Sequence, residues 1–221
     1  MIHNVQLEDK ELEDFILEEG DTAVPLEIYR SEQTDQYEIL VYPCCLPNVL
    51  PILENSLDLF DHDVLESLTS ILNPLLDSFS FVSSPDGISR ICEFKMDLPS
   101  NALTSLILPD TAIFFPTEDS EEETVSACHI SDGKQVAEAA PNDYSDDDSV
   151  EIHVQCLPEF RGKGYATSCV AKLTEYYLKN GNSVRYLCRM QNKASLRIAE
   201  KCGFTLRGNR VSFVYYRCGS L

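Results

Sequence analysis

The segment from Pro158 to Thr167 combines residue types that suit phosphate binding; it reads Pro-Glu-Phe-Arg-Gly-Lys-Gly-Tyr-Ala-Thr. Gly162 and Gly164 let the backbone turn tightly and approach a ligand closely. A helix that begins here would present free N–H groups and the positive end of its dipole. The side chains of Arg161 and Lys163 would add charge-assisted hydrogen bonds. These residues predict a diphosphate-binding loop. The alternative is a tight strand-to-helix connection that needs glycine for geometry alone.

The glycine spacing excludes two common phosphate loops. A dinucleotide-binding loop needs a third glycine after Gly162 and Gly164, and none stands at the required position. A Walker loop needs a glycine five residues before the Gly162-Lys163 pair and a Ser or Thr directly after it, and both are missing. The loop therefore predicts phosphate binding of another kind.

The elements around this loop follow from hydrophobic spacing. Apolar and polar residues alternate over Ser149–Leu157, which predicts a strand that leads into the loop. Residues Gly164–Lys179 place apolar side chains on one helical face, and Asn180-Gly181 ends that helix. Downstream we expect a strand over Val184–Met190 and a short helix over Lys193–Cys202, which Gly203 ends in a left-handed conformation. A last strand is expected over Val211–Arg217.

The region before the loop also predicts strands and helices. Asp132-Gly133 is a strong hairpin signal between two apolar runs, Thr124–Ile130 and Gln135–Ala140. From residue 124 the expected order is therefore β-β-β-α-β-α-β, which indicates a mixed α/β sheet. Further strands are expected at Tyr37–Tyr42, Ile88–Met96 and Ala112–Pro116. We also expect two helices between 47 and 76, separated at Asp61–Asp63, and a short helix at Leu7–Glu19.

Composition narrows the class of protein. The chain has 221 residues, of which 43% are hydrophobic, so one large or two small globular domains are expected. No run of about 18 apolar residues and no secretory signal is visible, which favours a cytoplasmic protein without a membrane partner. The nine cysteines are odd in number and form no C-x-x-C pair, so we expect reduced thiols and no metal site.

The charge is unevenly distributed along the chain. The net charge is −20, with 33 acidic and 5 basic residues in 1–150 but 4 acidic and 12 basic residues in 151–221. The overall charge argues against nucleic-acid binding, because the field would repel phosphates. A basic C-terminal third indicates a local anion site, and the acidic remainder favours a cationic partner such as an amine. The acidic stretches Glu118–Glu123 and 141–148 either line the acceptor side or are solvated loops.

Two motifs together resemble a known family. Arg161-x-x-Gly164-x-Ala166 matches the R/Q-x-x-G-x-G/A signature for acetyl-coenzyme A in the GNAT superfamily of N-acetyltransferases. The block from Asn192 to Phe204 is similar to that family's N-x-x-S…K-x-G-F block, about thirty residues later. The resemblance covers about 124–217, and the composition of 148–204 resembles the zwittermicin-resistance type of GNAT protein.

The resemblance implies a fold and a division of the chain. The expected fold class is α/β (α+β), with a mixed, mostly antiparallel GNAT-type sheet, a splayed central strand pair and helices on both faces. The splay would lie between 150–157 and 184–190. Residues 111–221 would form the acetyl-CoA-binding core. Residues 1–110 would be a divergent N-terminal region that supplies the first strand and helices of the fold or forms a vestigial subdomain.

The resemblance also implies a coenzyme site. Acetyl-CoA would be the co-substrate, with its pyrophosphate on the loop amides, its pantetheine arm in the splay and Asn192 nearby. Ser195 would assist, or would only begin the second helix. The residues expected to bind the coenzyme are Val154, Cys156, Leu157, Arg161, Gly162, Lys163, Gly164, Tyr165, Ala166, Thr167, Asn192 and Ser195.

The implied reaction is acetyl transfer to a primary amine of a small cationic acceptor by direct attack. A base would take the amine proton. Glu151 is the first candidate for this base, Glu138 the second, and His153 is also suited by its ordinary pKa of about 6.5. Many family members place a tyrosine seven residues after the asparagine to protonate the leaving thiolate, but Ala199 occupies that position here. Tyr215, Tyr216 or solvent would then supply the proton.

Two other classes of function remain open at this point. A non-catalytic module that binds acyl-CoA as a sensor or scaffold would explain Ala199. An acidic interaction protein without a coenzyme would require both motifs to be chance. For the enzyme, the expected state is a monomer or homodimer.

Overall fold

The computed structural model describes residues 4–7, 22–85, 87–99, 101–116, 125–144 and 149–219. Two compact units can be distinguished: unit 1, made of Met1–Ile91 and Gly208–Leu221, and unit 2, made of Cys92–Arg207. Two strands, β5 (Ser89–Met96) and β11 (Thr205–Arg217), have residues in both units.

This division differs from the boundary expected near residue 110. Cys92, Met96 and Leu103 lie in the same buried cluster as the helices and strands that follow them, so 92–110 belongs with unit 2. At the other end, Gly208–Leu221 groups with unit 1 because β11 pairs along β2. Long-range packing, rather than a change of composition, sets both boundaries.

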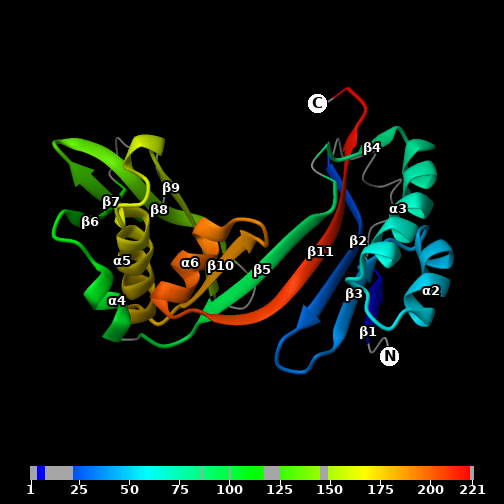
Figure 1. Ribbon diagram of the computed structural model, residues 1–221, viewed down its shortest axis with the longest axis horizontal. Coiled ribbons are helices and arrows are strands. Elements are labelled where there is room, and N and C mark those ends of the chain that lie inside the picture. The colour runs from blue at the N-terminus through cyan, green and yellow to red at the C-terminus, as the bar shows by residue number, and fades with distance from the viewer. Residues whose placement is uncertain are drawn as a thin grey trace. The chain divides into compact units, whose positions relative to one another are not determined.

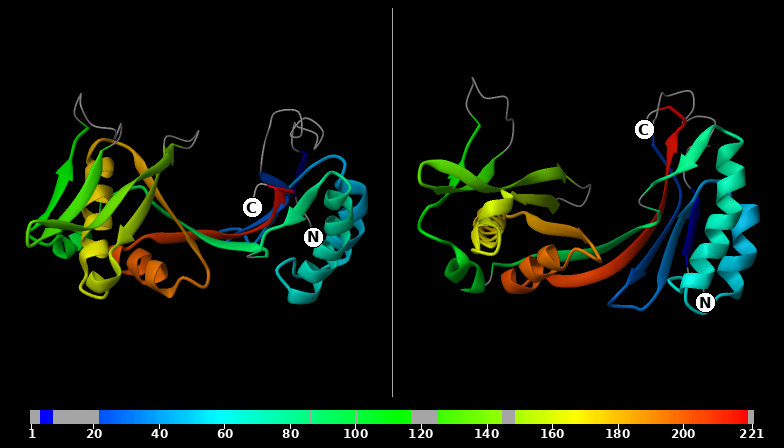
Figure 2. Two further views of the ribbon diagram at one scale, coloured as in Figure 1. Left: turned by 90° about the horizontal axis from the view of Figure 1, so that it is seen from above. Right: turned by 45° about the horizontal axis from the view of Figure 1, so that its top comes forward.

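Unit 1 is a sheet with two helices on one face (Figures 1 and 2). The strand order is β1-β3-β2-β11, with β4 also paired to β11; β1 and β3 are parallel and the other pairs are antiparallel. The elements are β1 (Asn4–Leu7), β2 (Thr22–Ser31), β3 (Tyr37–Val41), α2 (Leu46–Asn55), α3 (His62–Asp77) and β4 (Phe81–Ser83).

The core of unit 1 forms where α3 meets the sheet. Leu65, Leu68, Leu72 and Leu76 follow helical spacing and are each at most 1% exposed. Asp61 caps this helix by accepting a hydrogen bond from the Asp63 backbone N–H at 2.9 Å, so the expected break between two helices is confirmed.

Strand β2 was not expected from the sequence. It buries Ala23, Leu26 and Ile28, but Pro25 and Glu27 interrupt the apolar pattern that predicts a strand. Its partners β3 and β11 supply the hydrogen bonds that hold it extended. The helix expected at Leu7–Glu19 falls almost entirely outside the described residues.

Unit 2 contains a mixed sheet, and the expected fold class is confirmed. Neighbouring strands are antiparallel from β6 to β9, β9 and β10 are parallel, and β5 follows β10 in the order. The observed order after residue 125 also matches the expected β-β-β-α-β-α-β. The further elements are α4 (Asn101–Leu106), β6 (Thr111–Phe114), β7 (Ser126–Ser131), β8 (Lys134–Tyr144), β9 (Ser149–Cys156), a 3₁₀ turn η1 (Pro158–Phe160), α5 (Tyr165–Lys179), β10 (Ser183–Arg189) and α6 (Lys193–Cys202).

Helix α5 is the centre of unit 2. It packs against the strands from β6 to β10 and contacts both α4 and α6 (Figure 2). Cys169, Val170 and Leu173 on its inner face are fully buried. The β7–β8 turn has φ values of 51° at Asp132 and 75° at Gly133, as the Asp-Gly hairpin signal predicts. In the described part of the chain, no helix is both long and apolar enough to cross a bilayer.

Candidate active site

Strands β9 and β10 separate partway along their length. Their parallel register runs from Ser149 opposite Ser183 to Ile152 opposite Tyr186 and ends there. The last part of β9, Val154 to Cys156, therefore lies beyond the paired part of the two strands. The splay expected from the sequence is confirmed, and it opens toward the loop that precedes α5.

The loop has the backbone geometry that its glycines predicted. Gly162 and Gly164 have φ values of 79° and 90°, which residues other than glycine rarely adopt. A Cβ atom at either position would meet no protein atom within 4 Å, so backbone conformation rather than internal crowding calls for glycine. Gly164 is the N-cap of α5, and no side chain caps the helix at this end. The first-turn N–H groups of α5 are suited to an anionic ligand.

A cavity of about 780 Å³ joins the loop to the splayed strands within unit 2. Its walls come from β8, β9, the loop, the start of α5 and one side of α6. Most of the residues expected to bind the coenzyme line it: Val154, Cys156, Leu157, Arg161, Gly162, Gly164, Tyr165, Ala166, Thr167, Asn192 and Ser195.

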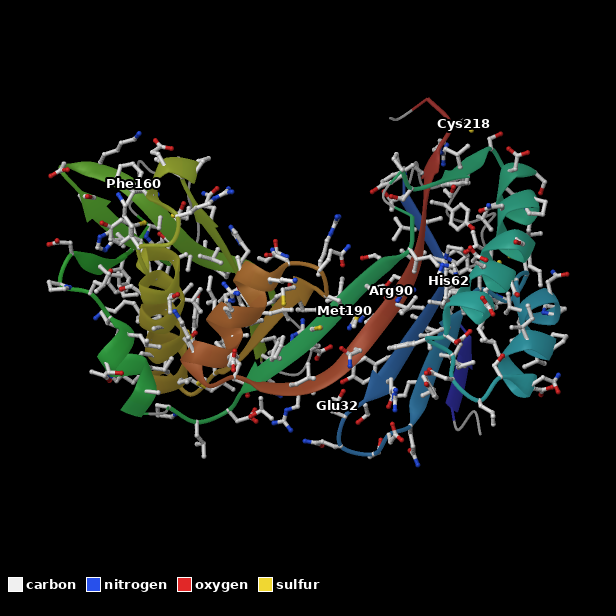
Figure 3. The ribbon with its side chains drawn as sticks, in the orientation of Figure 1. Glu32, His62, Arg90, Phe160, Met190 and Cys218 are labelled. Carbon is white, nitrogen blue, oxygen red and sulfur yellow. The ribbon has the colours of Figure 1, made fainter. Side chains whose placement is uncertain are left out.

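Lys163 is the one expected coenzyme residue that does not line the cavity. Its Nζ lies 4.8 Å from the ring centroid of Phe160, a cation–π arrangement. Figure 3 labels Phe160, which belongs to the 3₁₀ turn before the loop. The side chain of Lys163 therefore supports the loop from beside the cavity.

Polar contacts hold two walls of the cavity in place. The Arg161 Nε donates to the carbonyl oxygen of Cys156 at 3.2 Å, which ties the loop to the end of β9. The Asn192 Oδ1 accepts from the Ser195 backbone N–H at 3.2 Å and so caps α6. Both roles suggested for Ser195 are compatible with this arrangement, because the residue lies in the first turn of the helix and also lines the cavity.

A buried polar chain lies behind the loop. The His129 ring stacks on Tyr165 with centroids 4.1 Å apart, and its Nδ1 lies 2.8 Å from the Thr111 hydroxyl. That hydroxyl lies 2.7 Å from the Ser168 Oγ, which accepts from the Leu108 backbone N–H at 2.8 Å. The chain links β6, β7 and the first turns of α5, and it supports the position of Tyr165 in the cavity wall.

Glu138 is the candidate base that lines the cavity. It lies on β8 opposite Gln155 of β9. Its Oε2 accepts hydrogen bonds from Gln135 Nε2 at 3.2 Å and from Gln155 Nε2 at 3.1 Å. The Cys128 thiol lies 3.8 Å from Oε1. These side chains orient the carboxylate without neutralising it by an ion pair.

Glu151 lies elsewhere on the same strand and does not line the cavity. Its Oε1 accepts from Asn142 Nδ2 at 3.0 Å, and its Oε2 is 3.5 Å from Arg185 Nη2. His153 is exposed and is also absent from the cavity wall. The alternation of β9 correctly placed these side chains on one face, but only Gln155 of that face reaches the cavity.

The tyrosines expected to replace the missing proton donor lie in unit 1. Tyr216 is opposite Thr22 and Val82 in the sheet, and the Tyr215 hydroxyl donates to Asn73 Oδ1 at 2.9 Å. Neither residue lines the cavity. Ala199 is fully buried in the core of unit 2, so it leaves no functional group at the family's tyrosine position.

The sequence interpretation missed a second group of wall residues. These are the polar side chains that flank Glu138 and the side of α6 that faces the cavity. Helical spacing was the available signal for α6, because its wall residues recur at each turn, at 194, at 197 and 198, and at 201. They are Gln135, Gln155, Ala194, Arg197, Ile198 and Lys201.

The cysteines form no disulfide in the structure. Cys156 lines the cavity, and burial raises the pKa of its thiol, which keeps it protonated and a weak nucleophile.

Outside the cavity, His62, Asp63 and Glu66 bring three potential metal-ligand atoms within 4.8 Å of one another at the exposed start of α3. His62 lies 3.7 Å from the Glu66 carboxylate, which is an ordinary helix-surface pair.

Comparison with known proteins decides the family. The model of the acetyltransferase (GNAT) domain matches residues 77–205, more than half of the chain. The chain belongs to the GNAT acetyltransferase family. No match was found among curated protein sequences.

A comparison with solved structures also finds GNAT proteins, of which the first described here has a similar fold. A GNAT-family protein from Novosphingobium aromaticivorans is 17% identical with a TM-score of 0.52, over 62% of this chain and 68% of that one. A GCN5-related N-acetyltransferase-like protein from Streptococcus suis is 16% identical with a TM-score of 0.47, over 71% and 76% of the two chains. A GNAT-family acetyltransferase from Colwellia psychrerythraea is 13% identical with a TM-score of 0.46, over 81% and 76%.

Proposed function

We propose that this GNAT protein transfers the acetyl group of acetyl-CoA to a primary amine of a small cationic acceptor. The observation that carries the proposal is the cavity of about 780 Å³ in which the glycine loop, the splayed end of β9 and the carboxylate of Glu138 meet. The zwittermicin-resistance resemblance, the cytoplasmic location and the monomeric or homodimeric state stay predictions.

The cavity residues suit the chemistry of acetyl-CoA. The N–H groups at the start of α5 and the Arg161 guanidinium would bind the diphosphate. The stretch from Val154 to Cys156 is paired with β8 but not with β10, and on the β10 side it leaves backbone groups for the amides of the pantetheine arm. Bound coenzyme supplies the thioester that is to be attacked, and no metal is needed for that step.

Glu138 is the group that we assign as base, in preference to Glu151. Its position in the cavity wall allows it to accept a proton from the acceptor's ammonium group, directly or through one water, which leaves a neutral amine that can attack. The amine nitrogen would then bond to the acetyl carbon, the carbon–sulfur bond would break, and the second proton lost by the nitrogen would reach the departing thiolate through solvent. A thiol pKa near 8.5 makes this last proton transfer feasible without a tyrosine. The negative charge of Glu138 is also the reason to expect a cationic acceptor.

Ala199 favours one alternative, a module that binds acyl-CoA without turnover. Two measurements on one protein separate the alternatives. Acetyl-CoA at about 100 times its dissociation constant should stabilise the fold by about 2.7 kcal/mol, which raises Tm by several degrees. A panel of primary amines should then release free thiol faster than the amine-free control. A Tm shift without turnover on any amine would support the binding module, and the absence of both would contradict each alternative.

The loop offers a closely matched control. Gly164 and Gly181 have φ values of 90° and 89°, and a Cβ at either meets nothing within 4 Å, but only Gly164 lines the cavity. Gly164→Glu should abolish the Tm shift and turnover, because it places a negative charge at the diphosphate site. Gly181→Glu carries the same backbone strain and should keep both. Equal losses in the two variants would show that the glycine serves folding only.

A further inference from the structure

Two adjacent cysteines in unit 1 hold their sulfur atoms side by side. Cys44 and Cys45 stand between two prolines in the segment 43–47, Pro-Cys-Cys-Leu-Pro, directly before α2. Their Sγ atoms are 3.7 Å apart. In an extended strand neighbouring side chains point to opposite faces, so this proximity requires a turn. The match to the GNAT domain begins at residue 77, so that domain does not account for the pair.

The backbone around the two cysteines is held on both sides. The Tyr42 carbonyl oxygen accepts hydrogen bonds from the N–H groups of Cys45 at 2.9 Å and Leu46 at 3.2 Å. The Cys45 carbonyl oxygen in turn accepts from the Val49 N–H at 3.2 Å. Cys45 is fully buried in the core of unit 1, whereas Cys44 is partly exposed. One sulfur is therefore anchored in the core, and the other gives a ligand access to it.

The spacing of the two sulfurs suits a shared ligand better than a disulfide. Unstrained disulfides join Cα atoms about 4.4–6.8 Å apart, whereas neighbouring Cα atoms along a chain lie only about 3.8 Å apart. A single ion that binds two thiolates at about 2.3 Å with tetrahedral angles holds their sulfurs about 3.8 Å apart. The separation of 3.7 Å between the sulfurs of Cys44 and Cys45 is close to this value.

The number of ligands that each thiophilic group needs decides which of them fits. Zinc takes at least three protein ligands. In the ranges that the structure describes, the one group of three or more potential metal ligands is His62, Asp63 and Glu66, which includes neither cysteine. A trivalent arsenical that carries one organic group needs only two thiols, and soft thiolates are the ligands that such a centre prefers. The cysteine pair supplies these two thiols.

We propose that Cys44 and Cys45 form a dithiol site that chelates a monosubstituted trivalent arsenical. Two sulfur–arsenic bonds form and two arsenic–oxygen bonds of the hydrated arsenical break. The two thiol protons leave with these oxygens as two waters, and no electrons are transferred. The arsenic that Cys44 binds first lies beside the Cys45 sulfur, so the second bond forms within one complex. Neither cysteine lines the coenzyme cavity, so this inference does not depend on the proposed function.

The test is a titration with phenylarsine oxide in the presence of excess reduced glutathione, followed by mass spectrometry of the intact protein. The unaltered protein should retain one phenylarsenic group per chain. Cys44→Ser should weaken its binding by about a hundredfold or more, because the second bond of the chelate is lost. Cys44 is partly exposed, so this variant should fold, which circular dichroism checks. Cys218→Ser is the matched control, since it removes an exposed cysteine outside the pair and should keep the adduct.

A second measurement asks whether the folded turn, rather than adjacency in the sequence, makes the site. One equivalent of phenylarsine oxide should raise the Tm of the unaltered protein, because the folded turn already holds the sulfurs together. The Tm of Cys44→Ser should not rise. An unchanged or lower Tm of the unaltered protein would show that the unfolded chain binds equally well or better, which would overturn the inference.

Three outcomes of the titration would also overturn it. The first is the absence of any adduct on the unaltered protein. The second is an adduct that persists in Cys44→Ser, which would assign the arsenic to other cysteines. The third is an equal loss of the adduct in Cys44→Ser and Cys218→Ser. Binding of acetyl-CoA is unaffected by any of these results, so the proposed function is tested separately.

Discussion

Both units combine helices with a sheet, but they differ in how their strands are paired. In unit 1, β2 stays paired to β11 from Thr22 to Ser31, with one register shift. In unit 2, β10 leaves β9 after Ile152, and the cavity begins at that end. The cavity of unit 2 therefore lies where strand pairing is interrupted, whereas unit 1 keeps β2 and β11 paired and buries the leucines of α3 in its core.

The units also differ in where they leave polar groups without an internal partner. In unit 1, two cations near the sheet have acidic partners, Arg210 with Glu27 and Arg30 with Asp35. Unit 2 keeps the first N–H groups of α5, and the cations Arg197 and Lys201, at the cavity. Groups that folding does not satisfy are the groups available to a ligand.

The largest effect should come from the core of unit 1. Leu72→Ala removes a fully buried side chain of α3 and should lower the free energy of unfolding by about 2–5 kcal/mol. The dissociation constant for acetyl-CoA should remain within about twofold, because no described residue of unit 1 lines the cavity. Urea unfolding and calorimetry measure the two quantities. Leu57→Ala is the control, since Leu57 is 99% exposed. A tenfold loss of coenzyme affinity in Leu72→Ala would show that the site depends on unit 1.

The next effect should be catalytic and confined to unit 2. Glu138→Gln should lower kcat by a factor of about one hundred or more, which is the smallest loss expected when a general base is removed. A hundredfold loss corresponds to a rise of about 2.7 kcal/mol in the activation free energy. Glu151→Gln should lower it less than about fivefold, because that carboxylate faces Arg185 and Asn142 outside the cavity. Acetyl-CoA binding serves as the check on folding. The reverse ranking of the two variants would restore Glu151 as the base.

The smallest effect should be a loss of folding stability at alkaline pH, to which one buried tyrosine in each unit contributes. Burial raises the pKa of Tyr215 in unit 1 and of Tyr186 in unit 2 to about 12. Because the unfolded pKa is near 10, each contribution to stability is complete below pH 10 and is lost as pH rises from 10 to 12. Between pH 8 and pH 11 the free energy of unfolding should fall in every protein. In Tyr215→Phe and in Tyr186→Phe this fall should be about 1 kcal/mol smaller than in the unaltered protein. Urea unfolding across this range measures the difference, and identical slopes in all three proteins would contradict the pKa assignments.

Local signals in the sequence predicted much of the fold and the loop. The strand before Pro158, the glycine loop, the span of α5, the Asp132-Gly133 hairpin and the cap at Asp61 all follow from neighbouring residues. Strand β2 escaped prediction because its extended shape depends on hydrogen bonds to β3 and β11, which lie far away in the sequence.

The candidate site divides in the same way. Alternation along β9 showed which side chains share a face, but it does not show how far that face extends into the cavity. The register between β8 and β9 decides this, since it places Glu138 beside Gln155 in the cavity wall and leaves Glu151 opposite Asp143. Likewise, Tyr216 follows the GNAT motifs closely in sequence but belongs to unit 1 in space.

By itself the sequence determined most of the elements and the left-handed glycine positions of the loop, because helix spacing, turn residues and glycine dihedrals are set over a few residues. Only the tertiary structure decided which carboxylate, which cations and which stretch of strand surround the cavity. Those neighbours are brought together by strand register and helix packing, which depend on contacts between residues far apart in the chain.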